Sequence, residues 1–141
     1  MLQAHLGYVL EAGILEEMAQ VAKIRETAAD EVIMQVGDQL QMIPIVIEGS
    51  IKISRENENG DELLLYYMEG GDTCAMSLQC CTRKVDSQIK ATSMEPSLLL
   101  MFPSEYMERW LDQYKSWRQF ILDSYHTRML ELMESIDAIA F

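Results

Sequence analysis

The middle of the chain is a series of short apolar runs that glycine-containing corners separate. Residues 45–47 form a continuous apolar run, and beyond the corner at 48–50 the apolar residues Ile51 and Ile53 alternate with polar neighbours. Alternation with period two predicts half-buried strands, and a short continuous run predicts a strand buried on both faces. The Asn59–Gly60 pair predicts a type I′ hairpin turn, since both residues accept positive φ.

Further strands are predicted from the same pattern on both sides of this hairpin. Residues 23–38 contain short β-like pieces, and three more strands are expected within ELLLYYM, DSQIKATS and SLLLMF. The strands recur at spacings of about ten residues without helix-length crossovers, which predicts an antiparallel sandwich or barrel rather than a parallel sheet.

Both ends of the chain have a helical period instead. Residues 2–10 and 14–21 repeat apolar residues every three or four positions, and Ala12-Gly13 separates the two segments. After Pro103, residues 104–114 predict a short helix. Ser116 with Gln119 three residues later fits a capping box, which predicts the start of a long amphipathic helix of about twenty residues. The chain therefore divides into N-terminal helices (1–22), a β-roll (23–102) and a short plus a long helix (103–141).

The long helix has more apolar surface than one stripe can hold. Three apolar residues, Phe120, Leu130 and Met133, fall off the face that is defined by Trp117, Ile121, Tyr125 and Leu132. A second apolar face favours a symmetric dimer over a helix packed on two sides within one chain, although both remain open. The expected interface residues are Trp117, Ile121, Tyr125, Arg128, Leu132 and Ile136. The apolar end at 139–141 has no helix-stop residue, so we expect more chain downstream.

Composition and charge narrow the classes of protein to which the chain can belong. The 141 residues fit one domain, and 49% apolar residues exclude a disordered chain. A net charge of −12 excludes nucleic-acid binding through the domain's own surface, because such binding needs Lys and Arg. No apolar run is long enough to cross a bilayer, and the N-terminus lacks signal-peptide features, so a cytoplasmic protein is expected.

The three cysteines, Cys74, Cys80 and Cys81, fit a reducing compartment better than a disulfide framework. They do not make a zinc or iron–sulfur ligand set with the two distant histidines, so no metal site is predicted. Buried structural thiols are the first interpretation. Redox sensing by these three residues is the alternative, since Arg83 and Lys84 could lower a thiol pKa.

Catalytic chemistry has little support in the sequence. His126 lies on the long helix without a nucleophile or a base in a recognisable arrangement. We therefore predict that the protein is not an enzyme, and we assign no cofactor.

The stretch Gly70–Ala91 is the strongest candidate for a binding site. It opens with two glycines and an aspartate, and its pattern predicts a strand, a tight turn, one helical turn and a strand. A helical turn entered from a glycine corner has free backbone N–H groups that can hold an anion.

The order of these elements resembles the cyclic-nucleotide-binding domain of Crp/Fnr-type transcriptional regulators. The segments that carry the resemblance are VGD at 36–38, IPIVIEGSIKIS at 43–54 and NGDELLLYYMEGGD at 59–72. CAMSLQCC at 74–81 and the C-terminal tail are similar to a Bacteroidetes-type branch. The resemblance implies a double-stranded β-helix, or jelly-roll, with a phosphate-binding cassette, a small-molecule effector, and a homodimer formed through the long helix. It also implies that DNA is bound only through a winged helix-turn-helix downstream, and that no membrane is involved.

The cassette departs from the cyclic-AMP-binding pattern. The positions that hold Gly and Glu in the family fall on Ala75 and Met76, and the phosphate-binding Arg position falls on Val85. Arg83 shares a strand face with Val85 and is the better substitute. We therefore expect cyclic AMP to bind weakly or not at all.

A more apolar effector site is expected instead, and the effector itself is unknown. The residues expected to line the site are Gly71, Cys74, Ala75, Met76, Ser77, Arg83, Val85 and Tyr125. A ligand-free dimerisation module is the competing interpretation.

Overall fold

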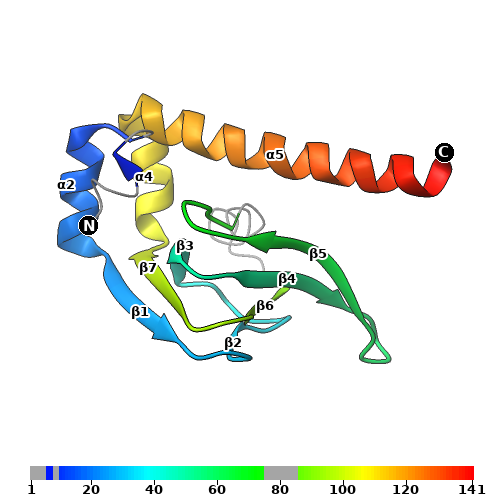
Figure 1. Ribbon diagram of the computed structural model, residues 1–141. Helices are drawn as coiled ribbons and strands as arrows, with labels where there is room; N and C mark the ends of the chain where they lie inside the picture. Colours follow the sequence, from blue (N-terminus) through cyan, green and yellow to red (C-terminus); the bar gives the residue numbers. More distant parts are fainter. Residues whose placement is uncertain (1–5, 8–9, 75–85) are drawn as a thin grey trace.

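Figure 1 shows the computed structural model, which describes residues 6–7, 10–74 and 86–141. Two short helices and one long helix accompany seven strands in this part of the chain. The elements are α2 (Ala12–Val21), β1 (Lys23–Thr27), β2 (Val32–Met34), β3 (Met42–Glu48), β4 (Ile51–Glu56), β5 (Glu62–Met68), β6 (Lys90–Ser93), β7 (Ser97–Pro103), α4 (Glu105–Gln113) and α5 (Lys115–Ala140).

The strands form two antiparallel sheets that face each other as a β-roll. One sheet has the order β1-β7-β3 and the other the order β2-β6-β4-β5. All the strand pairs are antiparallel, as the alternating pattern and the short connections require. The predicted mainly β jelly-roll with flanking helices is therefore confirmed.

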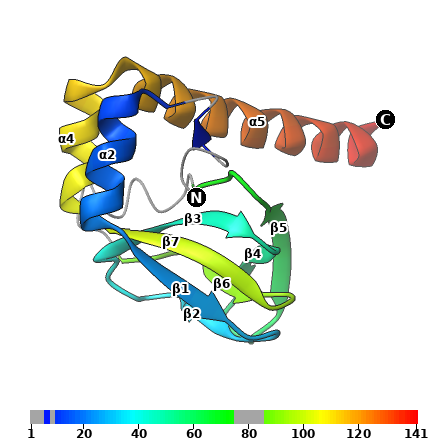
Figure 2. The same ribbon diagram turned by 60° about the vertical axis from the view of Figure 1, so that its left-hand side comes forward.

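Two buried clusters hold the fold together. Between the sheets lie aliphatic side chains that include Val46, Ile53 and Leu99. The second cluster joins β3 and β7 to the helices, and Trp110 and Trp117 are its largest members. Figure 2 shows α2, α4 and the start of α5 gathered at one end of the roll. These helices therefore bury an aromatic core that fixes where α5 begins.

The β4–β5 hairpin lies where it was predicted, but its turn is a different one. Gly60 has φ +83°, whereas among the described residues Asp30 is the only non-glycine residue with positive φ, so Asn59 does not adopt the type I′ conformation. The Asn57 side chain instead accepts the backbone N–H groups of Asn59 (3.0 Å) and Asp61 (2.8 Å). This hydrogen-bonding Asn makes a longer loop stable, and the prediction of a type I′ turn is wrong.

The start of α5 also differs from the prediction. The helix begins at Lys115, and Ser116 lies inside it rather than at a capping position. Glu11 Oε2 accepts hydrogen bonds from the Ser116 N–H (3.1 Å) and hydroxyl (2.8 Å), and Ser116 Oγ accepts one from the Glu11 N–H (2.9 Å). A carboxylate 105 residues away therefore satisfies the helix N-terminus, and the capping-box prediction is wrong.

These hydrogen bonds make the link between Glu11 and α5 dependent on pH. The Ser116 N–H, and then its hydroxyl, lower the pKa of the Glu11 carboxyl from its ordinary value of 4.5. A lowered folded-state pKa gives stabilisation that is present above the unfolded pKa and lost as the pH falls through the folded one. We therefore expect the stability advantage of the wild type over Glu11→Gln to shrink steadily below pH 4.5, as measured by urea unfolding. An advantage that is constant down to the acid transition would contradict this.

Helix α5 extends well past the helical end of the roll. It runs across the roll, and its C-terminal part projects away from the strands (Figures 1 and 2). Only Trp117 and Ile121 of this helix are buried. No helix in the described part of the chain is long and apolar enough to span a membrane.

Candidate functional site

The entrance to the predicted cassette is a tight turn at residues 69–72. The Asp72 N–H donates to the Glu69 carbonyl (2.9 Å), and the Glu69 N–H donates to Asp72 Oδ2 (2.9 Å). Gly71 has φ +92°, a conformation that a side chain would disfavour. The turn therefore orients the Asp72 carboxylate through its own backbone.

After this turn the chain runs alongside β3. The Gly71 N–H donates to the Val46 carbonyl (2.7 Å), and the Val46 N–H donates to the Asp72 carbonyl (2.9 Å). The Thr73 hydroxyl donates to the Pro44 carbonyl (2.9 Å). These bonds fix the residues that enter the cassette onto the roll.

Most of the predicted ligand-binding residues follow this entrance. Those that lie outside the described residues are Ala75, Met76, Ser77, Arg83 and Val85, together with the redox candidates Cys80 and Cys81. Gly71, Cys74 and Tyr125 are described. Gly71 forms the entrance turn, and Tyr125 lies on α5 with 40% of its surface exposed.

Cys74 points into the roll and is completely buried. Its Sγ lies 3.7 Å from the Tyr66 hydroxyl. The cavity beside it has a volume of only about 10 Å³, with Ile53, Met68 and Leu99 among its lining residues. This part of the roll interior is therefore filled by side chains and has no space for an organic molecule.

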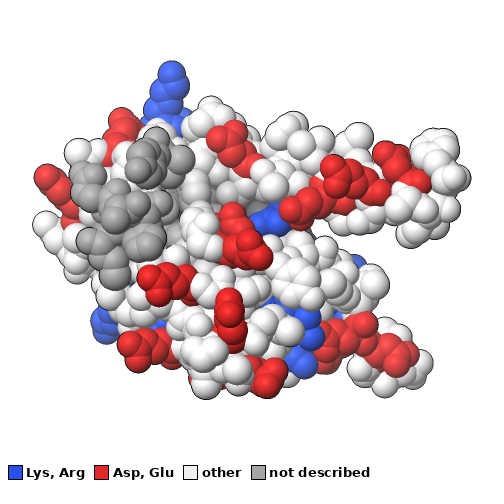
Figure 3. Space-filling view, viewed as in Figure 1, with Lys and Arg blue, Asp and Glu red and all other residues white. Residues whose placement is uncertain are grey.

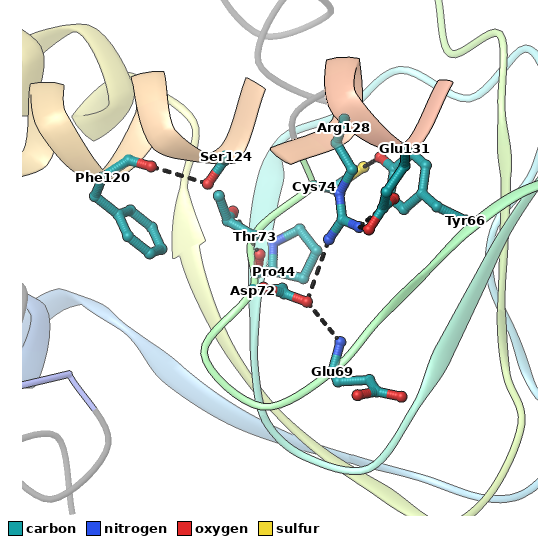
Figure 4. A network of polar contacts seen from close by, with 10 residues as sticks. All are labelled: Pro44, Tyr66, Glu69, Asp72, Thr73, Cys74, Phe120, Ser124, Arg128 and Glu131. Atoms are coloured by element: carbon teal, nitrogen blue, oxygen red, sulfur yellow. Dashed lines mark hydrogen bonds and ion pairs between the residues drawn. The ribbon is translucent and has the colours of Figure 1, made fainter. Parts of the chain in front are cut away.

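A charged cluster links the middle of α5 to the cassette entrance (Figure 4). Arg128 Nη2 lies 3.2 Å from Asp72 Oδ2, and Arg128 Nη1 lies 3.0 Å from Glu131 Oε2. The guanidinium also lies over the Tyr66 ring, 4.2 Å from its centroid. We call these four residues, Tyr66, Asp72, Arg128 and Glu131, the Arg128 cluster.

Two open grooves flank the Arg128 cluster. One, of about 410 Å³, lies toward the start of α5 and includes Gln119, Asp123 and Ser124. The other, of about 420 Å³, lies against β5 and includes Leu64, Leu65, Tyr67 and Glu69. Asp72, Thr127 and Arg128 line both grooves. A small molecule bound in either groove would therefore contact both the roll and α5.

The residues predicted for a dimer interface separate into three groups. Trp117 and Ile121 pack in the chain's own core, where Trp117 contacts Phe102 and Trp110. Arg128 faces the roll, where it meets Asp72 and Tyr66. Their assignment to a dimer interface is therefore wrong for the two core residues. Tyr125, Leu132 and Ile136 are 40%, 53% and 62% exposed.

These three residues belong to a longer exposed stripe that the sequence pattern did not separate from the core face. The exposed apolar residues Leu122, Tyr125, Met129, Leu132, Ile136 and Ile139 are spaced alternately three and four positions apart. We call them the α5 seam. Alternate spacing of three and four is the repeat of helices that pair in a coiled coil.

Sequence reasoning missed Tyr66, Asp72 and Glu131 as site residues. The Arg128–Glu131 pair has the i, i+3 spacing of helical ion pairs and could have been found. Asp72 and Tyr66 reach Arg128 only through the fold, so no local pattern indicates their contact. In the described part of the chain no group of three or more potential metal ligands comes together.

Comparison with known families gives one match. The family model for the cyclic nucleotide-binding domain matches residues 24–114. No match was found among curated proteins.

Solved structures with the same architecture include bacterial regulators. The chain is similar to the Thermus thermophilus catabolite activator protein, with a TM-score of 0.72 and 18% identity over 93% of this chain and 61% of that one. The c-di-GMP responsive regulator CLP from Xanthomonas campestris gives a TM-score of 0.76 and 18% identity over 93% and 65% of the two chains. The sensor domain of the transcriptional regulator DNR from Pseudomonas aeruginosa gives a TM-score of 0.71 and 20% identity over 94% and 89%. The chain thus spans less than two thirds of the first two proteins and most of the third.

Proposed function

Because the chain belongs to the cyclic nucleotide-binding domain family, we propose that it is the effector-sensing and dimerisation domain of a Crp/Fnr-like transcription regulator. DNA would be bound only through a separate C-terminal domain of that regulator. The role is regulatory rather than catalytic, and the division into residues 1–22, 23–102 and 103–141 is part of the proposal.

The resemblance seen in the sequence is confirmed at the level of family and fold. The family match covers most of the roll, and the structural neighbours are regulators of the Crp/Fnr type. One of them is the sensor domain of a transcriptional regulator, which this chain matches along most of its length. This supports a sensor role for the chain.

The observation that carries the proposal is the α5 seam. Six apolar side chains, each at least 40% exposed, follow a heptad repeat on a 26-residue helix. Burying such a stripe against a second copy removes apolar surface from water, and a two-fold axis lets one stripe serve both chains. The proposed interface therefore includes Tyr125, Leu132 and Ile136 and excludes the two core residues.

The grooves beside the Arg128 cluster suggest how an effector could act. An effector held between the cassette entrance and α5 would favour the α5 position that it contacts best. Because α5 also carries the seam, the effector would change the geometry of the dimer and so the spacing of the attached DNA-binding domains.

A ligand-free dimerisation module is the second candidate. The cavity beside Cys74 favours it, because its volume of about 10 Å³ is too small for an effector. Burial of Cys74 also argues against this residue as the reactive thiol of a redox sensor.

Native mass spectrometry of freshly purified protein tests the proposal. We expect a dimer, and no added mass with cyclic AMP, since the family's phosphate-binding Arg is replaced at Val85.

Leu132→Glu places two carboxylates in the dry centre of the interface, which should weaken dimerisation by about 100-fold or more and give a monomer.

Ala138→Glu is the matched control, because it adds the same charge to an exposed helix position outside the seam. It should leave the dimer unchanged. A wild-type protein that is monomeric and carries no bound molecule would overturn the proposal. A retained small molecule would favour the sensor, and a dimer without one would favour the dimerisation module.

A further inference from the structure

The guanidinium of Arg128 contacts three side chains that favour a cation. The Tyr66 ring covers one face of the guanidinium, and the carboxylates of Asp72 and Glu131 accept its N–H groups. The Arg128 side chain is only 12% exposed. An aromatic face combined with carboxylates is how proteins hold guanidinium and ammonium groups.

Two of these walls are built by the roll without help from α5. Tyr66 lies in β5, paired with Ile53 of β4. The Asp72 carboxylate is oriented by the Glu69 N–H in the entrance turn. Tyr66 and Asp72 would therefore keep their positions if Arg128 moved away, and a preorganised site loses little free energy on binding.

The surrounding charge also favours a cation over an anion. Glu69, Asp72 and Glu131 line the groove against β5, and Arg128 is the one basic residue among its described lining residues. Figure 3 shows that acidic side chains predominate on this face of the molecule. Leu64, Leu65 and Tyr67 in the same groove offer an apolar surface for a hydrocarbon tail.

We propose that Tyr66, Asp72 and Glu131 form a binding site for small guanidinium compounds with an apolar tail, and that Arg128 is its tethered occupant. A free guanidinium compound competes with Arg128 and so releases the contact between α5 and the cassette entrance. The regulatory effect of such a ligand rests on the proposed function, because the helix that it releases carries the α5 seam. The binding itself depends on neither a dimer nor a DNA-binding domain.

Removal of the occupant should strengthen binding of a free cation. Ethylguanidinium binding is measured by calorimetry with the wild type and with Arg128→Ala. A tethered group competes with an effective concentration of about 1 mM, which weakens the binding of a ligand of about 0.1 mM affinity roughly tenfold. We therefore expect about tenfold tighter binding to Arg128→Ala than to the wild type. Arg128→Gln retains a long side chain without charge, and it should also bind ethylguanidinium more tightly than the wild type does.

Three controls make the result specific. Neutral ethylurea should not bind to any variant, because it lacks the charge. Asp72→Asn combined with Arg128→Ala should lose most of the gained affinity. Arg109→Ala, which removes a guanidinium 5.0 Å from the centroid of the Tyr106 ring, should gain none.

Circular dichroism verifies that each variant is folded. Equal ethylguanidinium affinity in the wild type, Arg128→Ala and Arg128→Gln would overturn the inference, and so would equal binding of ethylurea. A monomeric wild type that still shows the predicted order would overturn the proposed dimer while leaving the cation site intact.

Discussion

Gly49→Ala is expected to lower the free energy of unfolding by about 3 to 5 kcal/mol. Gly49 has φ +107°, and a Cβ added there would lie 2.1 Å from Ser97 Oγ and 2.8 Å from Ser97 Cα. The Ser97 side chain could rotate, but its Cα belongs to β7, which pairs with both β1 and β3. Relief of the overlap would therefore move a central strand.

Ser97 also has polar contacts that the added methyl group would disturb. Its hydroxyl donates to the Glu95 carbonyl (2.8 Å) and accepts the Ser50 N–H (3.3 Å). Ser93 and Thr27 continue this network of buried hydroxyl groups. Buried polar groups that lose their partners add to the loss of stability.

The Gly60→Ala variant separates the effect of steric overlap from the effect of positive φ on stability. Gly60 also has positive φ, +83°, but no atom lies within 4 Å of the position that a Cβ would take there. It should lose only about 1 to 2 kcal/mol, the cost of a left-handed conformation for alanine. Urea unfolding followed by circular dichroism measures both variants, and equal losses would show that Ser97 yields without cost.

Trp117→Ala is expected to lower the free energy of unfolding by about 3 to 5 kcal/mol. Trp117 is completely buried, and its ring centroid lies 5.6 Å from that of Phe102 and 5.4 Å from that of Trp110. Removal of the indole leaves a cavity between β7, α4 and α5, and these rigid elements can close it only in part. The loss should appear as a lower midpoint in urea unfolding.

Trp117→Phe should lose clearly less than Trp117→Ala. The Trp117 Nε1 is buried without a hydrogen-bond acceptor, so the phenyl ring retains aromatic contacts and removes an unsatisfied donor. Leu130→Ala, at a site on the same helix that is 45% exposed, should lose less than about 1 kcal/mol. A Leu130 loss as large as that of Trp117 would mean that α5 is held by its outer face.

The cassette entrance shows what a local sequence pattern predicts and what only the folded structure reveals. The entrance glycines and Asp72 were readable because a tight turn limits which residues can occupy it. The role of the Asp72 carboxylate could not be predicted from the sequence, since its partner Arg128 is 56 residues away. The residues expected to contact an effector at 75–85 stay a prediction.

The sequence by itself determined the antiparallel roll, its glycine corners and the helices at its ends. Period-two alternation, glycine conformation and the helical repeat all act between near neighbours, so they can be read without the fold. The amphipathic nature of α5 was determined in the same way.

Only the tertiary structure decided which face of α5 meets the roll. Trp117 and Ile121 enter the core because α4 and β7 are placed beside them, and Leu132 and Ile136 remain exposed because the helix extends past those elements. Contacts such as Glu11 with Ser116 and Arg128 with Tyr66 join residues far apart in the chain. Their free energy depends on distances that exist only once the chain has folded, so no local sequence pattern encodes them.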